Sequence, residues 1–152
     1  MVNVIKYLED LWILKDCGII IFSKVRTHAI DDQCLGGLTS ALYYFARQGL
    51  HETLLRFTTD KFEYKVIERE DLLFVATFPA KTKERVALNE LEYIADRFLE
   101  LYPKEVVEGW DHNMSRFLGF QEEVMTKKEK LGDFISYIGR SLENVTFISN
   151  DR

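Results

Sequence analysis

Two short apolar runs near the N-terminus predict a β-hairpin. The runs occupy positions 11–14 and 19–22 and are rich in the aromatic and β-branched residues that favour strands. The residues between them include Asp16 and Gly18, which are typical of tight turns. Neither run alternates apolar with polar positions, and unbroken runs of this kind are typical of strands covered on both faces. The pattern therefore predicts a sheet with helices on both sides.

A helical pattern follows the hairpin. It begins after Asp31 and Asp32, which can cap a helix, and ends at Gly49, which can terminate one. Apolar residues recur between these signals at intervals of three and four, as Leu35, Leu38, Leu42 and Phe45. We expect this stripe to face the sheet and the opposite side of the helix to face outward.

Three more strands are expected, at 53–58, 62–67 and 72–78. The second alternates apolar with charged residues, which predicts a half-exposed strand. The third is apolar without interruption over its first five positions, which predicts a central strand.

The C-terminal half predicts three helices. The first covers 83–102 and ends before Pro103, with an apolar stripe formed by Ala87, Leu91, Ile94, Phe98 and Leu101. The second covers 111–128, with its buried side formed by Met114, Phe117, Leu118, Val124 and Met125. The third is an amphipathic helix whose stripe is Leu131, Phe134, Ile135, Ile138, Leu142 and Val145.

Composition narrows the function. A length of 152 residues fits one domain, and 47% hydrophobic with 30% charged residues excludes disorder as the main state. A net charge of −5 argues against nucleic acid as a partner. Cys17 and Cys34 are too few for a disulfide framework, so we expect reduced thiols in the cytoplasm. No apolar run could span a bilayer, so membrane contact would be peripheral at most.

The sequence carries no common catalytic or nucleotide-binding motif, so we assign no catalytic, cofactor or metal residue. A polar group of mixed metal-ligand types precedes the first helix, formed by His28, Asp31, Asp32 and Cys34. Helix capping by the two aspartates explains this group more simply than a metal does. Lys127, Lys128 and Lys130 are interpreted as a solvated helix end rather than an anionic-surface contact, because Glu122, Glu123 and Glu129 flank them.

The element order β-β-α-β-β-β-α-α and the opening hairpin over 11–22 resemble the longin-type domain. That family includes N-terminal domains of some SNAREs, small adaptin subunits, the α subunit of the signal-recognition-particle receptor, and subunits of tethering and exchange-factor complexes. The resemblance covers residues 11–128 and implies an α+β fold, with a five-stranded antiparallel sheet flanked by helices on both faces. It implies no enzyme. Such domains often pair as platforms for small GTPases or vesicle-trafficking machinery.

The last amphipathic helix is not part of the basic longin domain. We therefore divide the chain into a longin-like domain, 1–130, and a C-terminal helix and tail, 131–152, that packs on or near it. The roadblock domain, another GTPase-associated platform, is a related alternative whose helix-first order fits less well.

The outward side of the first helix is the candidate partner surface. Two glycines inside a helix each cost about 1 kcal/mol relative to alanine. Small Gly36 and Ser40, one turn apart, would let another helix approach closely. The hypothesis is a dimer or partner interface that includes the edge strand 53–58, formed by Gln33, Gly36, Gly37, Ser40, Tyr43, Tyr44, Arg47, Thr53, Leu55 and Phe57. Alternatively, the glycines accommodate packing within the domain.

The C-terminal stripe is the second candidate surface. It either closes over the core or forms a detachable latch that holds a groove until a partner helix competes, through Phe134, Ile135, Ile138 and Leu142. The sequence thus predicts a non-catalytic cytoplasmic interaction module. Its partner would be a small GTPase or another longin- or roadblock-type domain, in a homodimer or heterodimer. The competing function is a small-ligand sensor or unrecognised enzyme at the polar start of the first helix, near His28 and Asp31.

Overall fold

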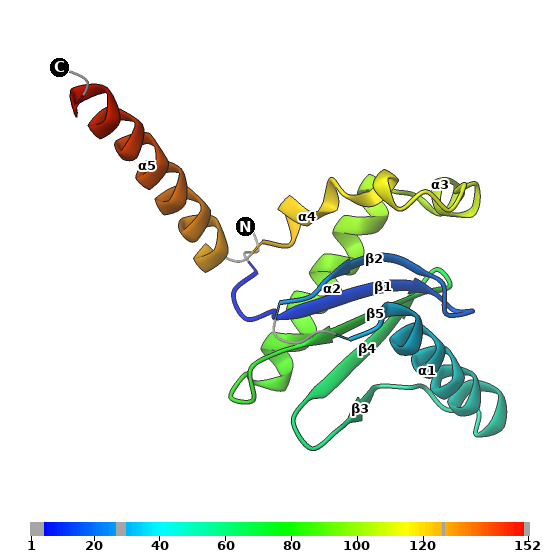
Figure 1. Cartoon of the computed structure of the whole chain (residues 1–152). Coiled ribbons are helices and arrows are strands. Elements are labelled where there is room, and N and C mark those ends of the chain that lie inside the picture. The colour runs from blue at the N-terminus through cyan, green and yellow to red at the C-terminus, as the bar shows by residue number, and fades with distance from the viewer. Residues whose placement is uncertain (1–4, 27–29, 126, 151–152) are drawn as a thin grey trace.

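The structure, a computed structural model, describes residues 5–26, 30–125 and 127–150, with residues 127–128, 133 and 143–150 described by their backbone alone. Among these residues, five strands form one sheet in the order β2-β1-β5-β4-β3, and every neighbouring pair is antiparallel (Figure 1). The strands are β1 (Asp10–Lys15), β2 (Ile20–Lys24), β3 (Arg56–Thr58), β4 (Glu63–Arg69) and β5 (Leu72–Thr77). The sheet that the longin resemblance implies is confirmed.

Strands β1 and β5 form the centre of the sheet. They pair along their whole length, from Asp10 opposite Thr77 to Lys15 opposite Leu72. Every residue of β5 is buried. The prediction that strands with unbroken apolar runs are covered on both faces is therefore confirmed for β1 and β5.

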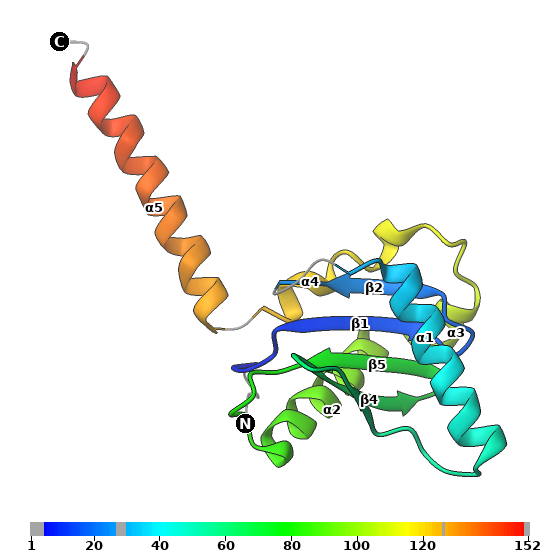
Figure 2. The same cartoon turned by 60° about the horizontal axis from the view of Figure 1, so that its bottom comes forward.

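Helices cover both faces of the sheet (Figures 1 and 2). Helix α1 (Asp32–Tyr44) lies on one face, and α2 (Glu84–Leu101) lies on the other. Three short helical segments complete the second layer, namely α3 (Lys104–Glu108), η2 (Met114–Phe117) and α4 (Phe120–Glu123). Alternate residues of β1 point into the two layers: Leu11 and Ile13 belong to the α2 side, and Trp12 and Leu14 to the α1 side.

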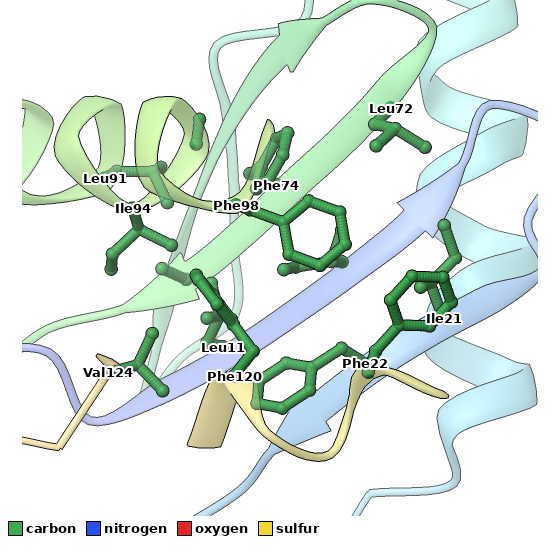
Figure 3. Close-up of a cluster of buried hydrophobic side chains, with 14 of the residues drawn as sticks. Leu11, Ile21, Phe22, Leu72, Phe74, Leu91, Ile94, Phe98, Phe120 and Val124 are labelled. Atoms are coloured by element: carbon green, nitrogen blue, oxygen red, sulfur yellow. The ribbon is translucent and has the colours of Figure 1, made fainter. Parts of the chain in front are cut away.

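The core on the α2 side is aromatic. Figure 3 shows Phe98 of α2 at its centre, with Phe74 of β5 and Phe120 of α4 around it. The Phe98 ring centroid lies 6.0 Å from that of Phe74 and 5.1 Å from that of Phe120, with both pairs edge to face. This packing fixes α2 and the short helices against the sheet.

The prediction of a single helix over 111–128 is wrong. Short helices replace it because their ends are set locally, by Gly109 after α3 and by Asn113, whose side chain accepts a hydrogen bond from the Ser115 backbone N–H. Phe117 and Val124 are buried as expected, but Met114 and Leu118 are exposed. The strand expected over 53–58 is limited to Arg56–Thr58.

The C-terminal helix, α5 (Lys127–Asn150), is longer than the expected 131–145 and extends away from the sheet and its helices (Figures 1 and 2). Its predicted stripe residue Val145 lies among those described by backbone only. In the part of the chain that the structure describes, no helix is both long enough and apolar enough to cross a membrane.

Candidate protein-interaction surface on helix α1

The first turn of α1 is fixed by two aspartates. The Asp31 carboxylate accepts hydrogen bonds from the backbone N–H groups of Gln33 and Cys34, at 2.8 and 3.2 Å, as an N-cap does. The Asp32 carboxylate accepts from Trp12 Nε1 at 3.2 Å and from Ser23 Oγ at 2.9 Å. Both side chains therefore serve to hold the helix start, Asp31 to its backbone and Asp32 to β1 and β2.

The middle of α1 rests on the β1–β2 turn. A Cβ atom added to Gly36 would lie 2.2 Å from the Gly18 carbonyl oxygen, a distance that real Cβ contacts do not show. One turn later, Ser40 Oγ donates a hydrogen bond of 2.6 Å to the Asp16 carbonyl oxygen. Gly18 itself has φ +99°, a conformation that favours glycine. The small residues of α1 thus allow a close approach within the domain.

This packing corrects the predicted orientation of α1. The buried side of the helix consists of Leu35, Gly36, Thr39, Ser40 and Tyr43. Gly36, Ser40 and Tyr43 therefore do not lie on an exposed partner surface, and the expectation that they do is wrong. The alternative, that the glycine accommodates packing within the domain, is confirmed for Gly36. Gly37, by contrast, has nothing near its Cβ position.

The apolar stripe expected to face the sheet points largely outward. Of its four residues only Leu35 is buried, whereas Leu38 is 51% exposed, Phe45 is 62% exposed and Leu42 is half-buried. Leu38, Leu42 and Phe45 follow the spacing i, i+4, i+7 and so lie along one side of the helix. We call these three residues the α1 stripe. It is an apolar surface on a helix whose inner side is already packed.

The end of α1 departs from regular α-helix. Residues Phe45–Gly49 form a π-helical segment, η1, in which the Leu50 N–H donates to the Phe45 carbonyl oxygen at 3.2 Å. Ala46 is buried in this segment, and Phe45 and Leu50 are exposed. The segment thus leaves Phe45 and Leu50 exposed at the C-terminal end of the helix.

Strand β3 supplies a sheet edge to the same region. It pairs with β4 at one side and is the last strand in the sheet order. Leu55, just before β3, is 65% exposed, whereas Phe57 is half-buried and its ring stacks on that of Tyr64 with centroids 4.8 Å apart. Edge strands offer unpaired backbone groups to a partner. Of the expected edge residues, Leu55 and Thr53 are therefore accessible, and Phe57 belongs largely to the core.

The remaining expected interface residues of α1 are exposed on its other flank. They are Gln33, Gly37, Tyr44 and Arg47. The Arg47 guanidinium lies 5.9 Å from the centre of the Tyr43 ring. The negative charge of Asp16 raises the pKa of Tyr44, and burial raises the pKa of Tyr43. The pKa of each tyrosine thus reflects the side of the helix on which it lies.

A ligand site at the start of α1 gains little support. His28 lies outside the described residues, and the carboxylates of Asp31 and Asp32 are occupied by the hydrogen bonds given above. Within the described ranges, no group of three or more His, Cys, Asp or Glu side chains could hold a metal ion.

A second possible ligand site is an open hollow of about 540 Å³ beside Glu90 of α2. The Glu90 carboxylate already accepts hydrogen bonds from the backbone N–H groups of Tyr7 and Leu8, both at 3.1 Å.

The expected latch residues of α5 are all solvent-exposed, namely Phe134, Ile135, Ile138 and Leu142. The apolar residues of both surfaces are evident from the sequence, but the outward position of Leu38 and Phe45 is not. The signal that could have placed them was the pair Gly36 and Ser40, because small residues mark the side of a helix that approaches another backbone closely.

Comparisons with known proteins place few limits on this surface. No protein-family model matches the sequence, and no curated protein matches it. Among solved structures, MglB of Myxococcus xanthus is similar at 16% sequence identity, with a TM-score of 0.49, over 61% of this chain and 84% of that chain. A similarity of this extent does not determine a shared function. The observed sheet and its helical layers agree with the fold that the longin resemblance implies.

Proposed function

We propose that this chain is a non-catalytic protein-interaction module that pairs with a second copy of itself through the α1 stripe and the neighbouring β3 edge. The observation that carries the proposal is the outward position of Leu38 and Phe45, on a helix that is already anchored to the sheet by its opposite side. Adjacent large apolar side chains left in water are typical of binding surfaces. Leu55, just before β3, is a further exposed apolar side chain and is part of the proposed interface.

The paired module would serve as a platform for a further protein. The longin resemblance supports this step, because paired domains of that type carry small GTPases or vesicle-trafficking machinery. We propose a small GTPase as the partner class and the cytoplasm as the location, with a heterotypic longin- or roadblock-type domain as the alternative second half of the pair.

Native mass spectrometry of the full chain tests the pairing. The stripe variant is Leu38→Glu/Phe45→Glu, and the matched control is Gln33→Glu/Gly37→Glu, which makes the same charge change on the other flank of α1. We expect a dimer for the wild type and the control and a monomer for the stripe variant, because buried glutamates in an apolar interface are strongly unfavourable.

Two results would contradict the proposal. One is a wild-type chain that is monomeric at every concentration, and the other is a dimer that survives in the stripe variant. Circular dichroism of each variant should show a retained fold, since all four substituted positions are exposed.

A further inference from the structure

Helix α5 is tied to the domain at its first turn. The Glu129 carboxylate forms ion pairs with Lys24 and Arg26, and the Arg26 Nη1 to Glu129 Oε1 distance is 3.3 Å. Beyond this turn the helix leaves the domain, and in both views it extends away from the sheet (Figures 1 and 2). The position of its start is therefore set by contacts with the domain.

The apolar stripe of α5 faces solvent. Phe134 is 58% exposed and Ile138 is 40% exposed, and Leu131, Ile135 and Leu142 are likewise exposed. An isolated helix is marginally stable in water, and most helices gain their stability by packing an apolar face. A helix of this kind therefore needs a surface that covers its stripe.

The start of α5 is more basic than the sequence alone suggests. The sequence places three lysines and one acidic residue within 127–130, although the whole chain has a net charge of −5. Two of the flanking acids already have cationic partners in the domain. Glu129 is paired with Lys24 and Arg26, and Glu123 accepts hydrogen bonds from Arg97 at 3.1 and 3.3 Å. These acids are neutralised locally, so they do not offset the positive charge that the sequence places at the helix start.

We infer that α5 binds the surface of an anionic phospholipid bilayer. The stripe Leu131, Phe134, Ile135, Ile138 and Leu142 enters the boundary between headgroups and acyl chains, and the lysines at the helix start contact the anionic headgroups. Stable attachment to a membrane surface takes two such signals together, an apolar face and a basic cluster. A helix that lies along the surface also agrees with the absence, among the described residues, of a helix fit to span a bilayer.

The pattern of α5 favours a bilayer over a second α5 helix. A two-helix coiled coil uses a narrow seam flanked by complementary charges. Here the exposed apolar arc also includes Phe134 and Tyr137, which makes it wider than such a seam. The flanking positions are Gly132, Phe134, Gly139 and Ser141, which offer no charge pairing. Helices α1 and α5 lie on different parts of the molecule (Figure 2).

Flotation of the full chain with vesicles tests the inference. The vesicles contain phosphatidylcholine and phosphatidylserine at three to one, with pure phosphatidylcholine vesicles for comparison. The stripe variant is Ile135→Glu/Ile138→Glu, and the charge-matched control on the polar side is Ser136→Glu/Arg140→Gln. A third variant, Lys127→Gln/Lys128→Gln/Lys130→Gln, removes the basic cluster.

We expect the wild type to float with the anionic vesicles, with binding that weakens as salt rises. The stripe variant should bind on the order of tenfold more weakly or not at all, and the polar-side control should bind within a few-fold of wild type. The lysine variant should lose the preference for anionic over neutral vesicles. The helical circular dichroism signal should rise when vesicles are added to the wild type, because the bilayer supports the helix.

Three results would overturn the inference. The first is a wild-type chain that does not float with anionic vesicles, and the second is equal binding by the stripe variant and the control. The third is self-association that depends on Ile135 and Ile138 and occurs without vesicle binding, which would assign the stripe to a second copy. The unfolding temperature of the domain should not change in any variant, since the substituted side chains described here are exposed.

Discussion

Helices α1 and α2 carry apolar residues at the same spacing of three and four, yet the structure buries only one of the two stripes. In α2, Leu91, Ile94 and Phe98 are completely buried against the sheet and the short helices. In α1 and the η1 segment that follows it, Leu38 and Phe45 are exposed, and the buried side of α1 is formed by smaller and more polar residues. An apolar stripe therefore predicts that a surface must cover it, but not whether that surface belongs to the same chain.

The difference arises from contacts that fix the rotation of α1 about its own axis. Asp32 binds Trp12 and Ser23, and Gly36 touches the backbone of Gly18. Helix α2 also has a polar anchor, because its Glu90 carboxylate accepts hydrogen bonds from the backbone N–H groups of Tyr7 and Leu8, but large apolar residues form most of its buried side. In α1, close backbone packing decides which side is buried, and the apolar stripe is left outside.

The largest expected contrast compares one phenylalanine from each helix. Phe98→Ala removes a ring that contacts Phe74, Phe117 and Phe120, so it should lower the free energy of unfolding by about 3 to 5 kcal/mol. Phe45→Ala removes an exposed ring and should change it by about 0.5 kcal/mol or less. Denaturant unfolding of both variants, at a concentration where the chain is monomeric, measures the difference. Similar losses in the two variants would show that Phe45 is part of the core.

The next contrast uses neighbouring glycines. Gly36→Ala would place a Cβ atom 2.2 Å from the Gly18 carbonyl oxygen, so the helix must shift and the free energy of unfolding should fall by about 1 to 3 kcal/mol. Gly37→Ala meets nothing and should raise the free energy of unfolding by up to about 1 kcal/mol through helix propensity. Denaturant midpoints give both values. If Gly36→Ala were neutral or stabilising, the proposed cause of the α1 rotation would be wrong.

The smallest expected effect compares two adjacent tyrosines. The pKa of Tyr44 is raised chiefly by the charge of Asp16, so Asp16→Asn should lower it towards its ordinary value. The pKa of Tyr43 is raised chiefly by burial, and it should stay raised in the same variant. Because neutral Tyr43 is favoured in the fold, its contribution to stability should decline as the pH rises above the ordinary tyrosine pKa. An NMR titration of the two rings measures both, and equal shifts would contradict their assignment to different sides of α1.

The elements that could be predicted from sequence are those in which a single pattern decides the structure. The unbroken apolar run of β5 and the stripe of α2 are of this kind, and both are buried as expected except Leu101, which is exposed at the end of α2. The rotation of α1 depends on the contact between Gly18 and Gly36. These two residues are distant in sequence, so the spacing of apolar residues within α1 does not reveal the contact. The short helices η2 and α4 are held by tertiary packing of Phe117 and Phe120, so helical periodicity joined them wrongly into one helix over 111–128.

The candidate partner surface also shows how far local sequence patterns can predict a structure. The sequence identified α1 and the edge near Leu55 as the region for a partner, and both remain exposed. The apolar periodicity wrongly placed Leu38 and Phe45 in the core and Gly36, Ser40 and Tyr43 on the surface, because it treats large apolar side chains as core and the residues opposite them as surface. A close backbone approach reverses that assignment, since only small residues fit where α1 meets the β1–β2 turn.

The central claim is that a second molecule covers the α1 stripe. Hydroxyl-radical footprinting of the wild-type chain below and above the concentration at which it pairs tests this most directly. We predict that oxidation of Phe45 and Leu38 falls when the chain pairs, while oxidation of Tyr7, an exposed aromatic on the N-terminal segment, does not change. Unchanged oxidation of Phe45 in the paired state would contradict the claim and would place the interface elsewhere on the molecule.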